Sequence, residues 1–272
     1  MKKIKIGIVG CGTIGLILAK AIESRLSKKT QLVAICDIDD TRIDNFLTRI
    51  KTKPYIGSLK ELVDRSDFII ESASKDVSAE VARKALLANK DVLIMSVGGL
   101  FMDKNVLDLA RKKRSHLHIP SGALAGLDGL KGASIAKIEK ISLTTKKSPK
   151  ALEGAPYLVK NNIDLSSLKE EKTIFEGSVG DAVNGFPKNV NVAAILGLVS
   201  SGLNQQKIHI KVVAVSGSGA NIHELEVEGE FGRLVSRTEN VPSPDNPKTS
   251  YLAALSAIAT LEGALDNVRI GT

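Results

Sequence analysis

Three closely spaced glycines follow an apolar stretch near the start of the chain, in "KIGIVGCGTIG". Gly10, Gly12 and Gly15 have the spacing G-x-G-x-x-G, which binds a pyrophosphate where a strand leads into a helix. The first glycine permits a tight turn, the second lets the backbone approach the phosphates, and the third lets the helix pack closely. The phosphates then lie at the helix start, so we expect Thr13 and Ile14 to contribute N–H groups.

An acidic residue ends the next apolar stretch, "QLVAICD". Asp37 lies about 20 residues after Gly15, the separation at which a carboxylate binds the adenosine ribose of a dinucleotide. A carboxylate there accepts hydrogen bonds from the ribose hydroxyls and repels a 2′-phosphate, which favours NAD over NADP. Arg42 lies near enough to weaken this discrimination, so the predicted cofactor is NAD or NADP.

A histidine opens the stretch "HELEVEGEF", in which glutamates alternate with apolar residues. Counting by twos places His223 on the same strand face as Leu225, Val227 and Phe231, so the imidazole is predicted to point inward. Histidine suits proton transfer because its unperturbed pKa lies near neutrality. A buried histidine satisfied by a backbone partner is the alternative interpretation. Of the other histidines, His118 is a second candidate, and the strand parity of His209 predicts that it faces solvent.

Strands and helices must alternate to position the glycine turn. From residue 4 to about 120, β-branched apolar runs alternate with helical stretches such as 76–90 and 103–114, which indicates a parallel sheet covered on both faces. Residues 1–120 are therefore predicted to form a Rossmann dinucleotide-binding domain. Ligands bind beyond the carboxyl ends of such strands. The small polar loop "ESAS" lies there, so Ala73 and Ser74 are predicted to contact the cofactor.

The pattern changes after residue 120. A glycine-rich stretch leads into alternating strands in "KIEKISLTTK", "KTIFEGSVG", "KIHIKVVAV" and "NIHELEVEG", with a helical stretch near 187–200. This pattern indicates a smaller α+β open-sheet catalytic domain over 121–246. The last segment, 247–272, opens with a proline and continues as an apolar helix, which we expect to pack back on the Rossmann domain.

Composition excludes several classes of protein. The 272 residues are 43% hydrophobic and include two cysteines, which suits a chain that folds without disulfides in a reducing cytoplasm. No uncharged apolar run reaches the length of about 18 residues that a membrane span needs, and we expect no signal peptide. The cysteines and histidines lack metal-ligand spacing, so no metal is predicted. The net charge of +8 is concentrated in 103–150, and we interpret it as a solvated basic face rather than a nucleic-acid site.

Five motifs in order resemble the L-aspartate dehydrogenase family over essentially the whole chain. They are the glycine turn, "SGALAGLDGL", "GFPKNVNVAA", "NIHELEVEGEFG" and "NPKTSYLAALSA". The resemblance implies oxidative deamination of L-aspartate with NAD or NADP, giving iminoaspartate for NAD biosynthesis. It also implies that Ala123 and Asn189 contact the nicotinamide cofactor, that His223 is the active-site residue, and that the protein is a homodimer. Residues 148–172 are interpreted as a surface insertion.

A substrate with two carboxylates calls for cationic partners. Lys188 precedes a helical stretch and is our candidate for binding the substrate, ahead of Lys248 and Arg233. For Asn189 the alternative role is a helix N-cap. Two other functions remain open: another two-domain dehydrogenase or reductase, of homoserine or dihydrodipicolinate type, and a nucleotide-binding redox sensor without turnover.

Overall fold

The chain forms two compact units. The computed structural model describes residues 2–187, 191–200, 208–217, 221–244, 246–268 and 270–271. One unit comprises Met1–Pro120 with Ala254–Arg269, and the other comprises Ser121–Ala253 with Ile270–Thr272. The candidate residues Lys188 and Asn189 lie outside the described residues.

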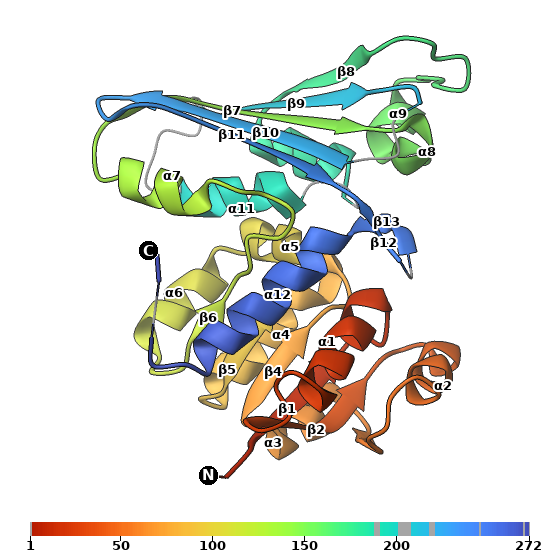
Figure 1. Ribbon diagram of the computed structural model, residues 1–272, viewed down its shortest axis with the longest axis vertical. Coiled ribbons are helices and arrows are strands. Elements are labelled where there is room, and N and C mark those ends of the chain that lie inside the picture. The colour runs from red at the N-terminus through yellow and green to blue at the C-terminus, as the bar shows by residue number, and fades with distance from the viewer. Residues whose placement is uncertain are drawn as a thin grey trace. The chain divides into compact units, whose positions relative to one another are not determined.

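A parallel sheet with strand order β3-β2-β1-β4-β5-β6 forms the centre of the first unit (Figure 1). Its strands are β1 (Ile4–Val9), β2 (Thr30–Cys36), β3 (Tyr55–Ile56), β4 (Phe68–Glu71), β5 (Asp91–Ile94) and β6 (Leu117–His118). The helices between them are α1 (Thr13–Glu23), α2 (Asp40–Leu47), α3 (Leu59–Arg65), α4 (Lys75–Leu87), α5 (Val97–Met102) and α6 (Asn105–Lys112). This order confirms the predicted Rossmann domain.

Helices cover both faces of this sheet, as the apolar strands require. On one face Ile6 and Ile8 pack in a buried cluster with Leu18 of α1 and with Ala257 and Leu261 of α12 (Tyr251–Ala264). Full burial of a Leu or Ile side chain stabilises the folded state by about 1.5–3 kcal/mol. Because Ala257 and Leu261 are part of this buried cluster, α12 belongs to the core of this unit. On the other face α3 comes so close to β1 that a Cβ on Gly7 would overlap the side chain of Leu62.

The second unit is built on an open mixed sheet with strand order β11-β10-β7-β9-β8. Its strands are β7 (Ile138–Lys147), β8 (Lys172–Gly177), β9 (Ile208–Ala214), β10 (Asn221–Gly229) and β11 (Gly232–Asn240). The helices are α7 (Leu127–Ala133), α8 (Pro149–Leu152), α9 (Pro156–Lys160), α10 (Val179–Gly185) and α11 (Asn191–Val199). Only the β7–β9 pair is parallel among the described pairings of this sheet, and α7 and α11 lie against one of its faces (Figure 1). The predicted α+β open sheet is confirmed.

Two local expectations were wrong. The stretch beginning at Asn246 is not the start of the last helix: β13 (Asn246–Ser250) pairs with β12 (Pro242–Ser243), and the helix begins at Tyr251. Phe231 does not share the inward face of His223, because the chain reverses between Gly229 and Gly232 and Phe231 is 38% exposed in the turn. The alternation in the sequence therefore continues past the end of the strand.

Candidate active site

The fold requires a glycine at two of the three positions in the turn after β1, but not at the third. Gly10 has φ +99°, and a Cβ there would lie 2.7 Å from the backbone N of Ala73. A Cβ on Gly15 would collide with the carbonyl oxygen of Gly10. Gly12 has an ordinary φ of −79°, and a Cβ there would meet nothing within 4 Å. The space in front of Gly12 is therefore open, as the approach of a pyrophosphate requires.

The start of α1 is available to an anion. The helix begins after Gly12, which has no side chain to cap it, and Leu16 N–H donates to the Gly12 carbonyl. The first N–H groups of a helix have no partner within the helix, so those of Thr13 and Ile14 are suited to a phosphate. The chain thus offers the N–H donors, the helix dipole and the open space that a dinucleotide needs.

Asp37 is held against the glycine turn. Its carboxylate accepts hydrogen bonds from Cys11 N–H at 2.7 Å and from Asp39 N–H at 3.1 Å. A carboxylate has about four acceptor positions, so two remain for ribose hydroxyls. The Arg42 guanidinium lies on Asp39, with Nε at 3.2 Å from Oδ2. Arg42 is therefore paired on its own helix rather than with Asp37.

The loops after β4 and β5 are joined by Glu71, a residue that sequence reasoning did not single out. Its fully buried carboxylate accepts from Ala73 N–H at 2.8 Å and from Ser96 N–H at 2.9 Å, and burial raises its pKa. Ser72 Oγ also donates to the Gly10 carbonyl at 3.0 Å, so the predicted residues Ala73 and Ser74 follow a residue that contacts the glycine turn. The signal in the sequence that could have identified Glu71 was an acidic residue at the end of the apolar run "DFIIE".

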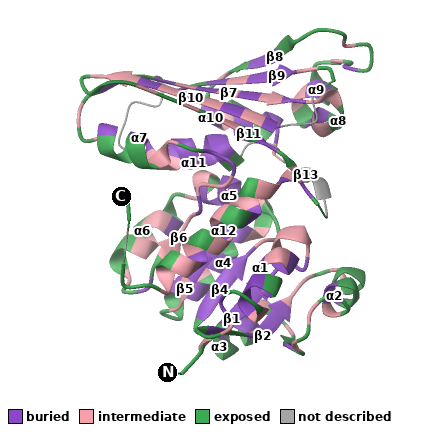
Figure 2. Ribbon diagram, in the orientation of Figure 1, coloured by how far each residue is buried: buried purple, intermediate pink, exposed green. Residues whose placement is uncertain are grey.

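His223 points inward, as predicted, and is 3% exposed. On β10 it lies between Thr145 of β7 and Thr238 of β11. Its Nδ1 is 3.1 Å from Thr145 Oγ1, so this ring nitrogen has a side-chain partner. Figure 2 shows that β10 and β7 are rich in buried residues. This face of the sheet therefore holds the imidazole in a fixed place.

A buried lysine lies on the same face. Lys147 follows Thr145 by two residues on β7 and is 6% exposed. Burial lowers the pKa of Lys147 to about 8. Burial, and then the charge of Lys147, lower the pKa of His223 to about 3, below the near-neutral value expected from the sequence. At neutral pH the face therefore presents a charged ammonium beside a neutral imidazole.

Ala123 is tied to this face through its carbonyl oxygen. Thr238 Oγ1 donates to it at 2.9 Å and Asn240 Nδ2 donates to it at 3.2 Å. Asn240 Nδ2 also reaches the carbonyl of Asn221, which pairs with Asn240 across the strands. Ala123, which the family resemblance assigns to the cofactor, is thus hydrogen-bonded to β11, the strand next to the one that carries His223.

Known proteins match this chain over its full length. The family model for the C-terminal domain of aspartate dehydrogenase matches residues 128–264, and the model for the NAD-binding domain of homoserine dehydrogenase matches residues 10–120. An L-aspartate dehydrogenase of Methanococcoides burtonii is 46% identical, over 99% of this chain and 100% of the relative. The chain belongs to the L-aspartate dehydrogenase family. It is accordingly an oxidoreductase that uses a pyridine nucleotide.

More distantly related proteins also match this chain over nearly its whole length. The L-aspartate dehydrogenase of Nitrosopumilus maritimus is 36% identical over 98% of this chain and 99% of its own length. The crystal structure of aspartate dehydrogenase from Thermotoga maritima matches with a TM-score of 0.73 at 22% identity, covering 99% of this chain and 100% of that one. At that identity the structural match supports the fold alone.

Arg233 and His209 lie on the face of the sheet opposite to His223. Arg233 pairs with Glu226 and Glu228 and its side chain is 62% exposed. His209 is exposed on β9, as predicted, and His118 belongs to the other unit. The side chain of Lys248 lies outside the described residues. No described helix has the length and apolar character needed to cross a membrane.

Lys147 is the functional candidate that sequence reasoning missed. Counting by twos along "ISLTTKK" places it in step with Ile141, Leu143 and Thr145, all of which are buried. A lysine on an inward strand face is unusual, because buried lysines need compensating partners. The position of Lys147 in step with these apolar residues was the signal in the sequence that could have identified it.

Proposed function

We propose that this protein oxidises L-aspartate to iminoaspartate, which water converts to oxaloacetate and ammonia. The observation that carries the proposal is that Lys147 and His223 are both buried on one inward face of the sheet, where the charge of Lys147 contributes to lowering the pKa of His223. A dicarboxylate amino acid needs a cation to bind a carboxylate and a neutral base to take up protons. The full-length similarity to L-aspartate dehydrogenases supports the choice of substrate.

NAD or NADP, when bound, accepts a hydride from the substrate Cα. Gly10, Gly12 and Gly15, with the N–H groups of Thr13 and Ile14, would hold the pyrophosphate at the start of α1. Asp37 would bind the adenosine ribose, and since Arg42 is paired with Asp39 we propose that NAD is preferred. For the nicotinamide end we propose Ala73, Ser74, Ala123 and Asn189.

Substrate binding would change the protonation of His223. In the free chain, burial and the charge of Lys147 hold its pKa at about 3, where an imidazole is a weak base. A substrate carboxylate lying against Lys147 neutralises that charge and so removes the second cause of the low pKa. Without that repulsion the protonated imidazole is favoured more, so the pKa of His223 rises when the substrate is present. The base would thus be activated by the substrate itself.

The proton transfers follow from this arrangement. Oxidation needs a neutral substrate amine, so His223 would accept a proton from the ammonium group and release it to solvent before hydride leaves Cα. Water then adds to the imine carbon, its proton passes to His223, and that proton returns to the departing ammonia. Thr145 contacts Nδ1, which leaves Nε2 as the nitrogen that exchanges protons. Lys188 would hold the second carboxylate.

A spectrophotometric assay tests the proposed substrate. We expect the absorbance of reduced nicotinamide to grow when the protein is mixed with NAD and L-aspartate, and to remain flat with glutamate, alanine or homoserine. A signal with homoserine but none with L-aspartate would contradict the proposal. Tight NAD binding with no signal from any amino acid would instead favour a nucleotide-binding redox sensor.

The cellular role can be tested separately. We propose that the iminoaspartate supplies NAD biosynthesis in the cytoplasm and that the protein acts as a homodimer. Expression of the chain should restore growth without nicotinate to cells that lack their own source of iminoaspartate, and failure of an active enzyme to do so would contradict this role. Light scattering tests the dimer: a mass near twice the 28.9 kDa chain supports it, and a monomeric mass contradicts it.

A further inference from the structure

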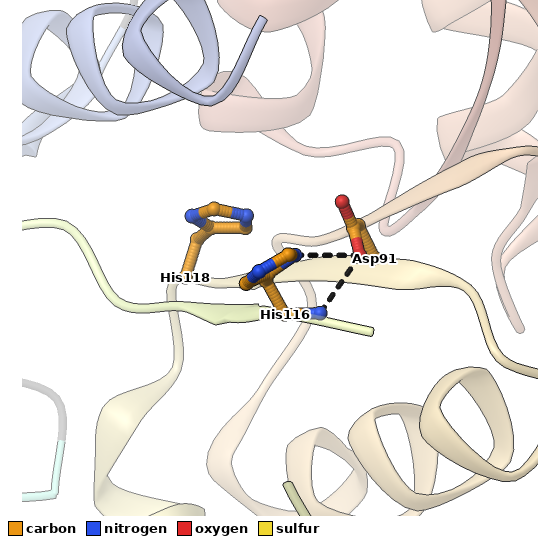
Figure 3. A group of neighbouring side chains, drawn as sticks. All are labelled: Asp91, His116 and His118. Atoms are coloured by element: carbon orange, nitrogen blue, oxygen red, sulfur yellow. Dashed lines mark hydrogen bonds and ion pairs between the residues drawn. The ribbon is translucent and has the colours of Figure 1, made fainter. Parts of the chain in front are cut away.

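Three potential metal ligands meet at one edge of the sheet in the first unit. Asp91 begins β5, His116 immediately precedes the neighbouring strand β6, and His118 is the second residue of β6. The two strands are parallel, with Val92 beside Leu117 and Leu93 beside His118. This register places Asp91 beside His116, and His116 and His118 share a face because they are two residues apart. Figure 3 shows the two imidazole rings and the carboxylate gathered together.

The geometry of this Asp91–His116–His118 cluster suits one small ion. One ligand atom of each side chain lies within 4.8 Å of the other two. Asp91 Oδ1 is 3.3 Å from His116 Nδ1 and also accepts the backbone N–H of His116 at 2.7 Å, which fixes the carboxylate. The ring of His118 stacks on Phe68, with centroids 5.5 Å apart. The His116 side chain is 63% exposed, so it has room to turn towards an ion.

We propose that Asp91, His116 and His118 bind a divalent zinc ion, with water as the fourth ligand. Two imidazoles and one carboxylate form a ligand set that zinc accepts, with bonds of about 2.0–2.2 Å. Tetrahedral ligands at such bond lengths lie about 3.4 Å apart, so closing the cluster requires movements of about 1 Å. The exposed His116 supplies most of that movement.

The site is separate from the proposed nucleotide site. Asp91 lies at the amino end of its strand, whereas the glycine turn follows the carboxyl end of β1 in the same parallel sheet. A zinc ion at the amino edge would join β5 to β6, an edge strand of two residues with two paired positions. Its effect is therefore to stabilise this edge of the unit, because binding only the folded chain raises the free energy of unfolding.

Calorimetric titration of the full chain with Zn²⁺ tests the proposal. We expect one ion per chain and a rise in the midpoint of thermal unfolding. The variant His116→Gln should weaken binding by at least about tenfold, since even hydrogen-bond partners of metal ligands are worth about 10–100-fold in affinity. The exposed His209 is a matched control, and His209→Gln should bind Zn²⁺ like the unaltered protein.

Two outcomes would overturn the proposal. One is Zn²⁺ binding that is unchanged in His116→Gln but lost in Cys36→Ser, which would place the ion at the thiols. The other is no saturable binding by the unaltered protein. His116→Gln should retain turnover with NAD, so a loss of zinc binding is distinguishable from a failure of the proposed enzymatic function.

Discussion

The nucleotide end of the first unit and the polar face of the second unit use the chain in opposite ways. In the glycine turn the backbone supplies the N–H groups and the open space, and the Asp37 carboxylate is fixed there by backbone donors. On the polar face the proposed chemistry rests on the side chains of Thr145, Lys147 and His223, which β7 and β10 position. Function is therefore local in sequence at the first site and assembled from distant strands at the second.

Replacing the imidazole tests the polar face most severely. His223→Asn should lower kcat by about 10²–10⁴, the usual contribution of a general acid or base. Binding of NAD should be unchanged, because His223 has no role at the glycine turn. The measurement is steady-state turnover with L-aspartate beside the NAD dissociation constant of the same variant. Near-normal turnover in a correctly folded variant would contradict the assignment.

Removing the buried cation should affect substrate binding more than folding. Lys147→Met keeps the length of the side chain and loses the charge, so KM for L-aspartate should rise about tenfold to a hundredfold, as expected for a hydrogen bond to a charged group. Lys211 on β9, whose side chain is 43% exposed, provides a control, and equal KM values for Lys147→Met and Lys211→Met would contradict the role.

The glycines allow a comparison within the nucleotide end. Gly15→Ala should destabilise the protein by about 1–3 kcal/mol, as overpacking does, because its Cβ meets the Gly10 carbonyl. Gly12→Ala should change stability by less than about 1 kcal/mol and yet weaken NAD binding. Denaturant unfolding and NAD titration of both variants separate the two effects. Unaltered NAD affinity in Gly12→Ala would show that the open space is not the phosphate site.

Acid sensitivity tests the burial of the imidazole. The pKa of His223 is lowered from 6.5 to about 3 in the folded chain, so the unfolded chain takes up the proton first as the pH falls. This residue therefore costs stability progressively from about pH 6.5 to about pH 3, by at most about 1.4 kcal/mol per pH unit. His223→Leu should flatten that part of the pH profile of unfolding. An identical slope in both proteins would contradict burial of a neutral imidazole.

The same contrast explains what the sequence could predict. The glycine spacing and Asp37 lie within one strand–helix–strand segment, so their arrangement follows from local geometry. The inward direction of His223 followed from alternation along one strand. The partnership of His223 with Thr145 and Lys147 depends on β10 pairing with β7, 78 positions away for the Thr145–His223 contact, and no local pattern encodes that pairing. The position of Phe231 failed for a related reason, because alternation does not mark where a hairpin turns.

The central claim is that Lys147 and His223 act as a pair on a dicarboxylate substrate. Nuclear magnetic resonance of the His223 ring, titrated with and without the unreactive dicarboxylate succinate, tests it most directly. The account predicts that the free protein keeps His223 neutral down to about pH 3 and that succinate raises its pKa towards neutrality. A ring that titrates near pH 6.5 in the free protein, or whose titration succinate leaves unmoved, would contradict it.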